Sequence, residues 1–173
     1  MKRVFLLAAL AFTLGLVLAG VGLGEKGGDE QVAKELWARI QGEEYRKTWK
    51  MWPGKEPFYK GREPHGALLT TYVSDGAYDA ITQRKGVMPE GAVIIKENYM
   101  PGKQLAAITV MKKIKGYNPE AGDWFWVKFL PDGRVETMES GGMEMKAAGK
   151  VGMCISCHSA RADNDYLYTG DIK

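Results

Sequence analysis

The feature that most constrains this chain is a C-x-x-C-H motif formed by Cys154, Cys157 and His158, which contains the only two cysteines of the sequence. In this motif the two thiols add to the vinyl groups of a haem, and the histidine becomes the proximal ligand of the iron. The cysteines lie about one helical turn apart, so both sulfurs can reach one edge of the porphyrin. We therefore predict one covalent haem c per chain, with His158 as the metal ligand.

Two other interpretations of the motif are a disulfide and a zinc site. A redox disulfide across two intervening residues would not need a histidine at the next position. Structural zinc takes four ligands, and the second histidine of the chain, His65, lies far upstream. Both interpretations explain the motif less well than haem does.

The N-terminus has the order of a secretory signal peptide. Two basic residues precede an apolar run at 4–18, and small residues follow it up to Gly24. Covalent haem attachment takes place outside the cytoplasmic membrane, so we expect a periplasmic or otherwise exported protein, cleaved after Ala19 or Gly24. An uncleaved anchor is the alternative, because an apolar run extended to Leu23 is just long enough to span a bilayer.

The rest of the chain, residues 25–173, is expected to form a single haem-binding domain. Two of the 24 basic residues lie in the signal peptide, so 22 remain against 21 acidic residues. The mature chain then carries almost no net charge, and its charges are well mixed, which argues against a nucleic-acid partner. The length is sufficient for one hydrophobic core.

The hydrophobic pattern predicts an α+β fold that is mainly antiparallel β. We expect a single-domain meander sheet with a few helices and a C-terminal c-type haem helix. The expected helices are 30–41, capped by Asp29, then 77–84 and the haem helix 147–159. The expected strands are 68–73, 92–99, 105–114, 123–130 and 134–139, with an irregular aromatic-rich segment at 43–63.

This layout excludes the familiar small cytochromes. A class I cytochrome c carries its haem motif near the N-terminus and a methionine ligand downstream, whereas only fifteen residues follow His158 here and none is Met or His. The four-helix bundle of a helical cytochrome c′ does not agree with the β pattern. Any sixth iron ligand must therefore come from upstream, or there is none.

Several short motifs together resemble the cytochrome P-460 family, which includes the β-sheet cytochromes c′ (cytochrome c′-beta). In order, they are Trp52-Pro53-Gly54, Pro64-His65-Gly66, Met88-Pro89-Glu90-Gly91-Ala92, Ile95-Lys96-Glu97-Asn98, Gly116-Tyr117, Asp123-Trp124-Phe125 and the haem motif. The resemblance covers about residues 35–170 and is closest to the c′-beta type. It implies a mainly antiparallel β fold, a homodimer, and a five-coordinate haem with an open distal face.

Two chemistries share the fold that this resemblance implies. Members of the P-460 type oxidise hydroxylamine, with a lysine cross-linked to the porphyrin and an acidic distal group. Members of the c′-beta type lack the cross-link and bind nitric oxide (NO) and carbon monoxide (CO) in an apolar pocket. Lys96 stands where the cross-linking lysine of the family is expected. If it is not cross-linked, we expect a lysine of the sheet that is solvated or ion-paired.

The acidic group is harder to find in this sequence. Residues 146–153, just before the haem motif, contain no Asp or Glu, and the nearest candidates are Glu139 and Glu144. Hydroxylamine oxidation releases protons at the iron, so the absence of a nearby base favours the gas-binding type. We expect a five-coordinate, gas-binding cytochrome. A hydroxylamine or NO oxidoreductase and an electron-transfer cytochrome with a redox partner protein are the alternatives.

Several other residues are candidates for contacts with the haem. Arg161 lies a few residues after the motif and could pair with a haem propionate, and Phe58 and Phe125 are candidate distal caps. Trp124 and Trp126 alternate with Phe125 and Val127, so one pair should pack in the core and the other should face a partner or the haem.

The remaining candidates are axial ligands from upstream. Met88, Met100 and Met111 could each serve as one, although most methionines are expected to fill the core. His65 lies between proline and glycine, so we expect a turn histidine that hydrogen-bonds the backbone rather than a distal ligand.

Overall fold

The computed structural model describes residues 25–173, and the predicted signal peptide lies outside them. The described part of the chain contains no helix of the length and apolarity that a membrane span requires. The four α-helices of this part are α1 Glu25–Gly42, α2 Tyr45–Thr48, α3 Asp75–Thr82 and α4 Gly152–His158. Two 3₁₀-helices, η1 Pro119–Ala121 and η2 Ser159–Asn164, complete the helical segments.

One antiparallel sheet forms the centre of the molecule. Its strands are β1 Lys50–Met51, β2 Tyr59–Lys60, β3 Leu68–Val73, β4 Val93–Tyr99, β5 Leu105–Lys113, β6 Trp124–Phe129 and β9 Ala148–Gly149. They follow the order β1-β3-β4-β5-β6-β9, and β2 also pairs with β3. The consecutive neighbours β3 to β6 confirm the expected meander. A separate hairpin consists of β7 Thr137–Ser140 and β8 Met143–Lys146.

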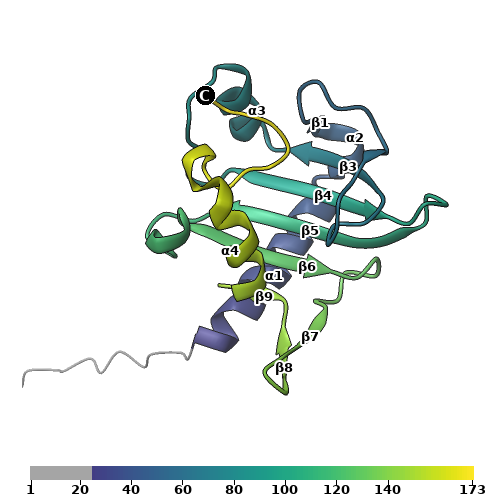
Figure 1. Ribbon diagram of the computed structural model, residues 1–173, viewed down its shortest axis with the longest axis vertical. Coiled ribbons are helices and arrows are strands. Elements are labelled where there is room, and N and C mark those ends of the chain that lie inside the picture. The colour runs from purple at the N-terminus through teal and green to yellow at the C-terminus, as the bar shows by residue number, and fades with distance from the viewer. Residues whose placement is uncertain (1–24) are drawn as a thin grey trace, which may run out of the picture.

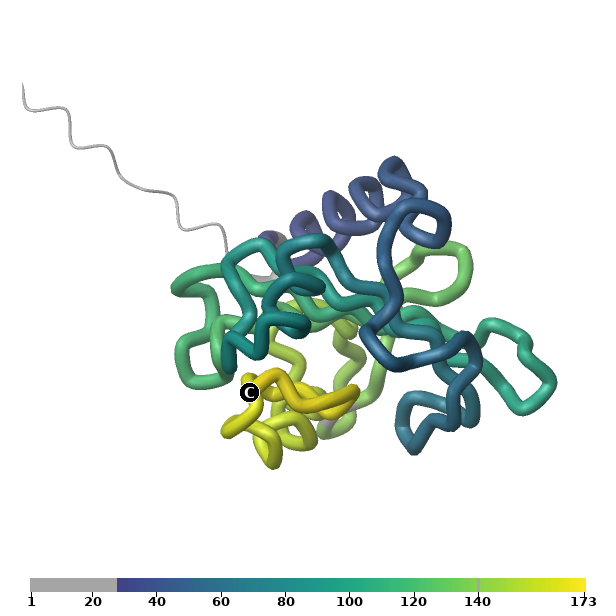
Figure 2. Tube along the Cα trace, turned by 90° about the horizontal axis from the view of Figure 1, so that it is seen from above, coloured from purple at the N-terminus to yellow at the C-terminus, as the bar shows by residue number. Residues whose placement is uncertain are grey.

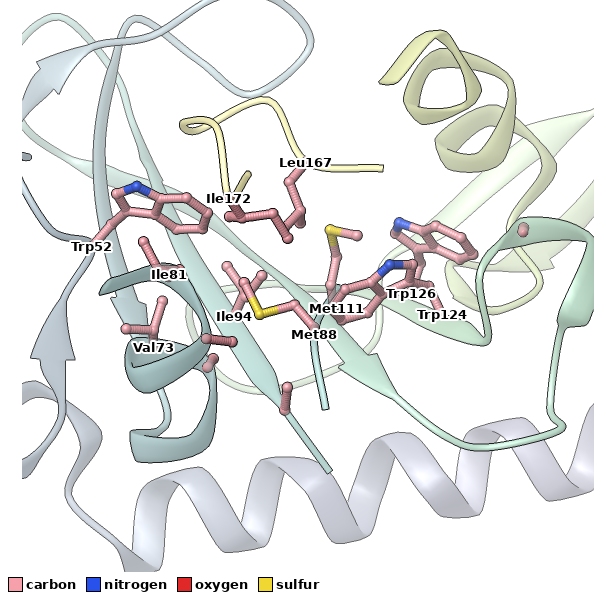
Figure 3. Packing of buried hydrophobic residues seen from close by; sticks show 14 of the residues in the cluster. Trp52, Val73, Ile81, Met88, Ile94, Met111, Trp124, Trp126, Leu167 and Ile172 are labelled. Atoms are coloured by element: carbon pink, nitrogen blue, oxygen red, sulfur yellow. The ribbon is translucent and has the colours of Figure 1, made fainter. Parts of the chain in front are cut away.

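The sheet lies between two layers. Helix α1 runs across one face, while α4 and the C-terminal tail cover the other (Figures 1 and 2). Alternate side chains of each strand point to opposite faces. On β4, Val93 and Ile95 belong to the core on the α1 side, and Ile94 belongs to the core on the opposite side. Figure 3 shows this second core, in which Trp124 and Trp126 from β6 lie close to Met111.

Two expectations about element boundaries were wrong. Helix α1 begins before Asp29, which lies inside the helix and accepts a hydrogen bond from the Tyr117 hydroxyl (2.7 Å) instead of capping it. The haem helix does not begin at residue 147, because β9 pairs with β6 there. Gly149 has φ +99°, and a Cβ at this position would lie 2.0 Å from Asp29 Oδ2, so glycine is needed where β9 meets α1.

The segment 134–139 was expected to be a strand of the main sheet. Only an isolated bridge joins Val135 to Phe129, and residues 137–140 pair with 143–146 in the separate hairpin. Strand β9 pairs with β6 and is the edge strand on that side of the sheet. The hairpin therefore projects from the sheet, as Figure 1 shows.

The C-terminal tail is anchored to the sheet through Asp165. One carboxylate oxygen of Asp165 accepts a hydrogen bond from Lys113 Nζ of β5 (2.5 Å), and the other accepts one from the backbone N–H of Met88 (2.7 Å). The backbone carbonyl of Asp165 accepts a hydrogen bond from the Trp124 indole (2.9 Å). Both charged side chains of the pair are at most 10% exposed, so this is a buried ion pair.

We predict that Asp165→Asn lowers the free energy of unfolding by about 3 kcal/mol, because it leaves the Lys113 ammonium buried without a counter-charge. Asparagine keeps the size of the side chain and tolerates the left-handed backbone found here (φ +51°). Urea unfolding of the haem-loaded protein measures the effect. The matched control is Asp163→Asn at an exposed site two residues away, which should cost less than about 1 kcal/mol. Equal effects of the two changes would contradict the anchoring role.

Candidate haem site

Cys154, Cys157 and His158 line one cavity between helix α4 and the sheet. Helix α4 is short, and all three residues lie on its last two turns. The floor of the cavity is the face of the sheet opposite to α1. The C-terminal motif is therefore brought against the middle strands of the meander, which come from much earlier in the chain.

The floor consists of two neighbouring rows of paired side chains. Ile94, Met111 and Trp126 are opposite one another across β4, β5 and β6, and all three line the cavity. The next row on the same face contains Lys96, Thr109 and Lys128. The floor is thus apolar along one row and carries amines and a hydroxyl along the next.

The walls come from three other parts of the chain. Pro64 and His65 precede β3, and Met138 projects from the β7–β8 hairpin. The tail contributes Leu167, Tyr168 and Thr169. None of the described residues that line the cavity is acidic.

His158 is held in a defined orientation. Its Nδ1 donates a hydrogen bond to the backbone carbonyl of Tyr166 (2.6 Å), a contact that fixes the tautomer and leaves Nε2 unprotonated. The rings of Trp126 and Tyr168 lie across it, with centroids at 6.3 and 5.5 Å. Burial lowers the pKa of His158, and the positive charge of Lys96 acts in the same direction. The imidazole is therefore neutral at physiological pH, the form that binds metals.

The two cysteines of the motif differ in exposure. Cys154 is half-buried against the sheet, and Cys157 is exposed. Burial, together with the neighbouring Cys157, raises the pKa of Cys154 to about 11. The Cys154 thiol is therefore protonated at neutral pH.

Lys96 is the expected cross-linking lysine, and the structure brings it into the cavity. Burial lowers its pKa to about 8, with a smaller contribution from the charge of Lys55. About a tenth of the amine is then neutral at pH 7. Lys128 in the same row is different, because its Nζ pairs with the Glu136 carboxylate at 2.7 Å.

His65 lies in a turn, as the sequence predicted, and its backbone N–H donates to the Arg62 carbonyl (2.9 Å). Its imidazole lines the cavity, and its ring centroid lies 6.1 Å from that of His158 with the two planes at 88°. Its Nδ1 is 3.4 Å from Thr109 Oγ1. Burial, with the nearby charges of Lys96 and His158, lowers the pKa of His65 to about 3, so this ring is neutral as well.

Other candidates lie outside the cavity. Arg161 pairs with Asp171 (2.5 Å) and packs over the Tyr168 ring, and Phe58 packs against Tyr99; neither lines the cavity. Phe125 as a distal cap was wrong, since its side chain belongs to the core on the α1 side.

Of the upstream methionine and acidic candidates, only one lines the cavity. Met88 is buried in the core away from the lining, Met100 is exposed, and Met111 lies in the floor. Glu139 and Glu144 are exposed partners in the β7–β8 hairpin. Neither of these two carboxylates lines the cavity.

Sequence reasoning missed the part of the floor formed by Thr109 and Lys128. Both follow the period of two along β5 and β6 that already separates Trp124 and Trp126 from Phe125. Continuing this period from Trp126 would have placed Lys128 on the same face. No sequence pattern indicates that Leu167 of the tail lines the cavity, because its position depends on the tertiary contacts that anchor Asp165.

The residues of the cavity fit a haem. Two thiols stand one helical turn apart beside an imidazole with an unprotonated Nε2, and the adjoining floor row is apolar. Trp126 Nε1 is buried and has no hydrogen-bond partner among the described residues. A buried N–H without a partner is costly, and a haem carboxylate is an acceptor that would satisfy it. Cys154 and Cys157 would hold the porphyrin, and His158 its iron.

Comparison with known proteins agrees with this geometry. No curated protein matches the chain. The family model described as Cytochrome P460 matches residues 42–169, which span the sheet, the cavity and the haem motif. The chain therefore belongs to the cytochrome P-460 family and is a haem-binding cytochrome.

Proposed function

We propose that this protein is an exported mono-haem c-type cytochrome that binds small neutral gases, NO and CO, at its haem iron. The observation that carries the proposal is the lining of the cavity, which is apolar along one floor row and contains no carboxylate among the described residues. A neutral diatomic gas loses little hydration when it enters such a pocket. With Cys154 and Cys157 as covalent attachments and His158 as proximal ligand, the opposite side of the iron is the site for the gas.

Proton-coupled oxidation of hydroxylamine has different requirements. A general base must lie within hydrogen-bond reach of the substrate. The candidates Glu139 and Glu144 are exposed on the hairpin, and Glu136 is paired with Lys128. The described part of the cavity therefore offers amines and imidazoles but no carboxylate.

A second candidate function, the hydroxylamine-oxidising P-460 type, is favoured by Lys96. The amine lies in the same cavity as the haem motif, and burial lowers its pKa to about 8. Its neutral fraction is nucleophilic, which is the state that a bond to the porphyrin requires. Gas binding and the cross-link can be distinguished by experiment.

We predict that the mature protein has the mass of the chain cleaved near Ala19 or Gly24 plus one haem. Replacing both cysteines, Cys154→Ala and Cys157→Ala, should make the haem extractable by acidified solvent, because both thioether bonds are lost. The matched control is Met153→Leu, which should retain the covalent haem. A mass equal to the bare polypeptide, or an intact N-terminus in the membrane fraction, would contradict the proposal.

We predict that the ferrous protein binds NO and CO and shows no hydroxylamine-dependent reduction of an acceptor. Digestion should recover the Lys96 peptide free of porphyrin, because the described lining of the cavity contains no carboxylate to take up the protons that hydroxylamine oxidation releases. If a haem peptide contains both Lys96 and the Cys154–Cys157 segment, and acceptor reduction is lost in Lys96→Arg but retained in Lys128→Arg, the protein is the P-460 enzyme instead.

We also propose that the mature protein is a homodimer. The proposal rests on the family resemblance and on the exposed apolar side chains of Met143 and Met145 on the hairpin. A disulfide link is not expected, because haem attachment uses both cysteines. Sedimentation at micromolar concentration should give a dimer that persists in reductant; a monomer alone would contradict it.

A further inference from the structure

Three methionines share one face of the β7–β8 hairpin. Residues directly opposite each other in an antiparallel pair lie on the same face, as do residues two apart in one strand. Met138 is paired with Met145, and Met143 lies two residues before Met145. From this arrangement we propose that the hairpin holds a metal site separate from the haem, which binds the soft cation Cu(I) through the thioethers of Met138, Met143 and Met145.

The turn of the hairpin fixes which residues share a face. Gly141 and Gly142 join the two strands, and both have positive φ (59° and 79°). Positive φ at both central residues is the mark of a two-residue type I′ turn, and such a turn sets the register of its strands. A slip by one residue, which would exchange the two faces, is therefore disfavoured.

The opposite face of the hairpin carries its carboxylates. Glu139 is paired with Glu144 there, and Thr137 with Lys146. The Lys146 ammonium donates a hydrogen bond to the Thr137 hydroxyl (2.8 Å), which agrees with the assignment of these side chains to one face. Carboxylates suit hard cations such as Ca²⁺ and Mg²⁺, whereas thioethers select Cu(I). The separation of the two ligand types favours a soft cation on the methionine face.

Packing within the chain does not account for these methionines. Met143 is 66% exposed and Met145 is 45% exposed, although β-branched and aromatic residues are the ones enriched in strands. Met138 is partly buried against the core and also lines the haem cavity. The proposed metal site would therefore lie beside that cavity and share Met138 with it.

The spacing of the three residues allows their sulfurs to reach one ion. Cβ atoms of directly opposite residues are about 5 Å apart, and diagonal neighbours are about 7–8 Å apart. A single methylene separates the sulfur from Cβ, and the flexible methionine side chain adapts readily to its surroundings. Because metal–sulfur bonds are about 2.3 Å long, sulfurs that converge from these positions can surround one cation.

The inference does not rest on the proposed gas binding, because neither the iron nor a gas takes part in it. It does use the two exposed methionines on which the proposed homodimer rests. Leucine separates the two roles, since it keeps the size and apolar character of methionine but has no sulfur. A change to leucine should therefore remove the cation and leave the dimer intact.

Equilibrium dialysis against Cu(I), kept reduced by ascorbate without oxygen, tests the proposal. The haem-loaded protein is used because free thiols would also bind Cu(I). Loss of an outer-shell partner already weakens metal binding about 10-fold or more, so the double change Met143→Leu and Met145→Leu should weaken it by at least that much. The sedimentation coefficient should not change. Absence of Cu(I) binding by the wild-type protein, or equal binding by the double variant, would overturn the proposal.

Two matched controls show whether the effect belongs to the methionine face. Met100→Leu changes a methionine outside the hairpin that is 53% exposed, and it should leave Cu(I) binding unchanged. The double change Glu139→Gln and Glu144→Gln on the opposite face should also have no effect. A loss of affinity in either control would contradict the assigned ligands, as would an X-ray absorption spectrum that shows only nitrogen and oxygen around the copper.

Oxidation of the methionines provides a measurement on the wild-type protein. An exposed thioether is oxidised to the sulfoxide, and a sulfur whose lone pair is bound to a metal should react more slowly. Ag(I), a soft cation that stays in one oxidation state, should protect Met143 and Met145 but not Met100, as read by mass spectrometry of the digested protein. Equal oxidation of the hairpin methionines with and without Ag(I) would overturn the proposal.

Discussion

The hydrogen bond from His158 Nδ1 to the Tyr166 carbonyl depends on how the C-terminal tail is fixed, and the site depends on this bond. Tyr166 follows Asp165, whose carboxylate is buried against Lys113 of β5 and the backbone of Met88. The ion pair stabilises the position of the Tyr166 carbonyl, and that carbonyl sets the tautomer and direction of the imidazole. A contact outside the cavity thus determines the orientation of the His158 ring inside it.

The pairing register of β4, β5 and β6 determines which side chains form the floor of the cavity. Because β4, β5 and β6 are paired side by side, side chains of one kind fall into rows: an apolar row that includes Ile94, and a polar row that includes Lys96 and Lys128. The polar row carries amines and a hydroxyl, and the described lining of the cavity contains no carboxylate. The lowered pKa of Lys96 has the same origin, since burial penalises its charged form.

Much of the fold could be predicted from the sequence, and so could the motif residues that line the cavity. Strand 68–73 agrees with β3, and the period of two through Trp124 and Trp126 separated the faces of β6 correctly. The boundaries of the haem helix could not be predicted, because they depend on the pairing of β9 with β6 and on the positive φ of Gly149. The position of His65 was also missed, since the pattern of a loop between proline and glycine does not show which cavity its side chain enters.

We propose that an iron bound by His158 accepts a small gas in a cavity whose described lining contains no carboxylate. The most direct test is the resonance Raman spectrum of the ferrous, haem-loaded protein with natural and isotopically labelled CO. We expect iron–carbon and carbon–oxygen stretching bands that shift with the label and have the frequencies typical of CO bound in an apolar pocket. A spectrum that does not change on addition of CO would contradict it.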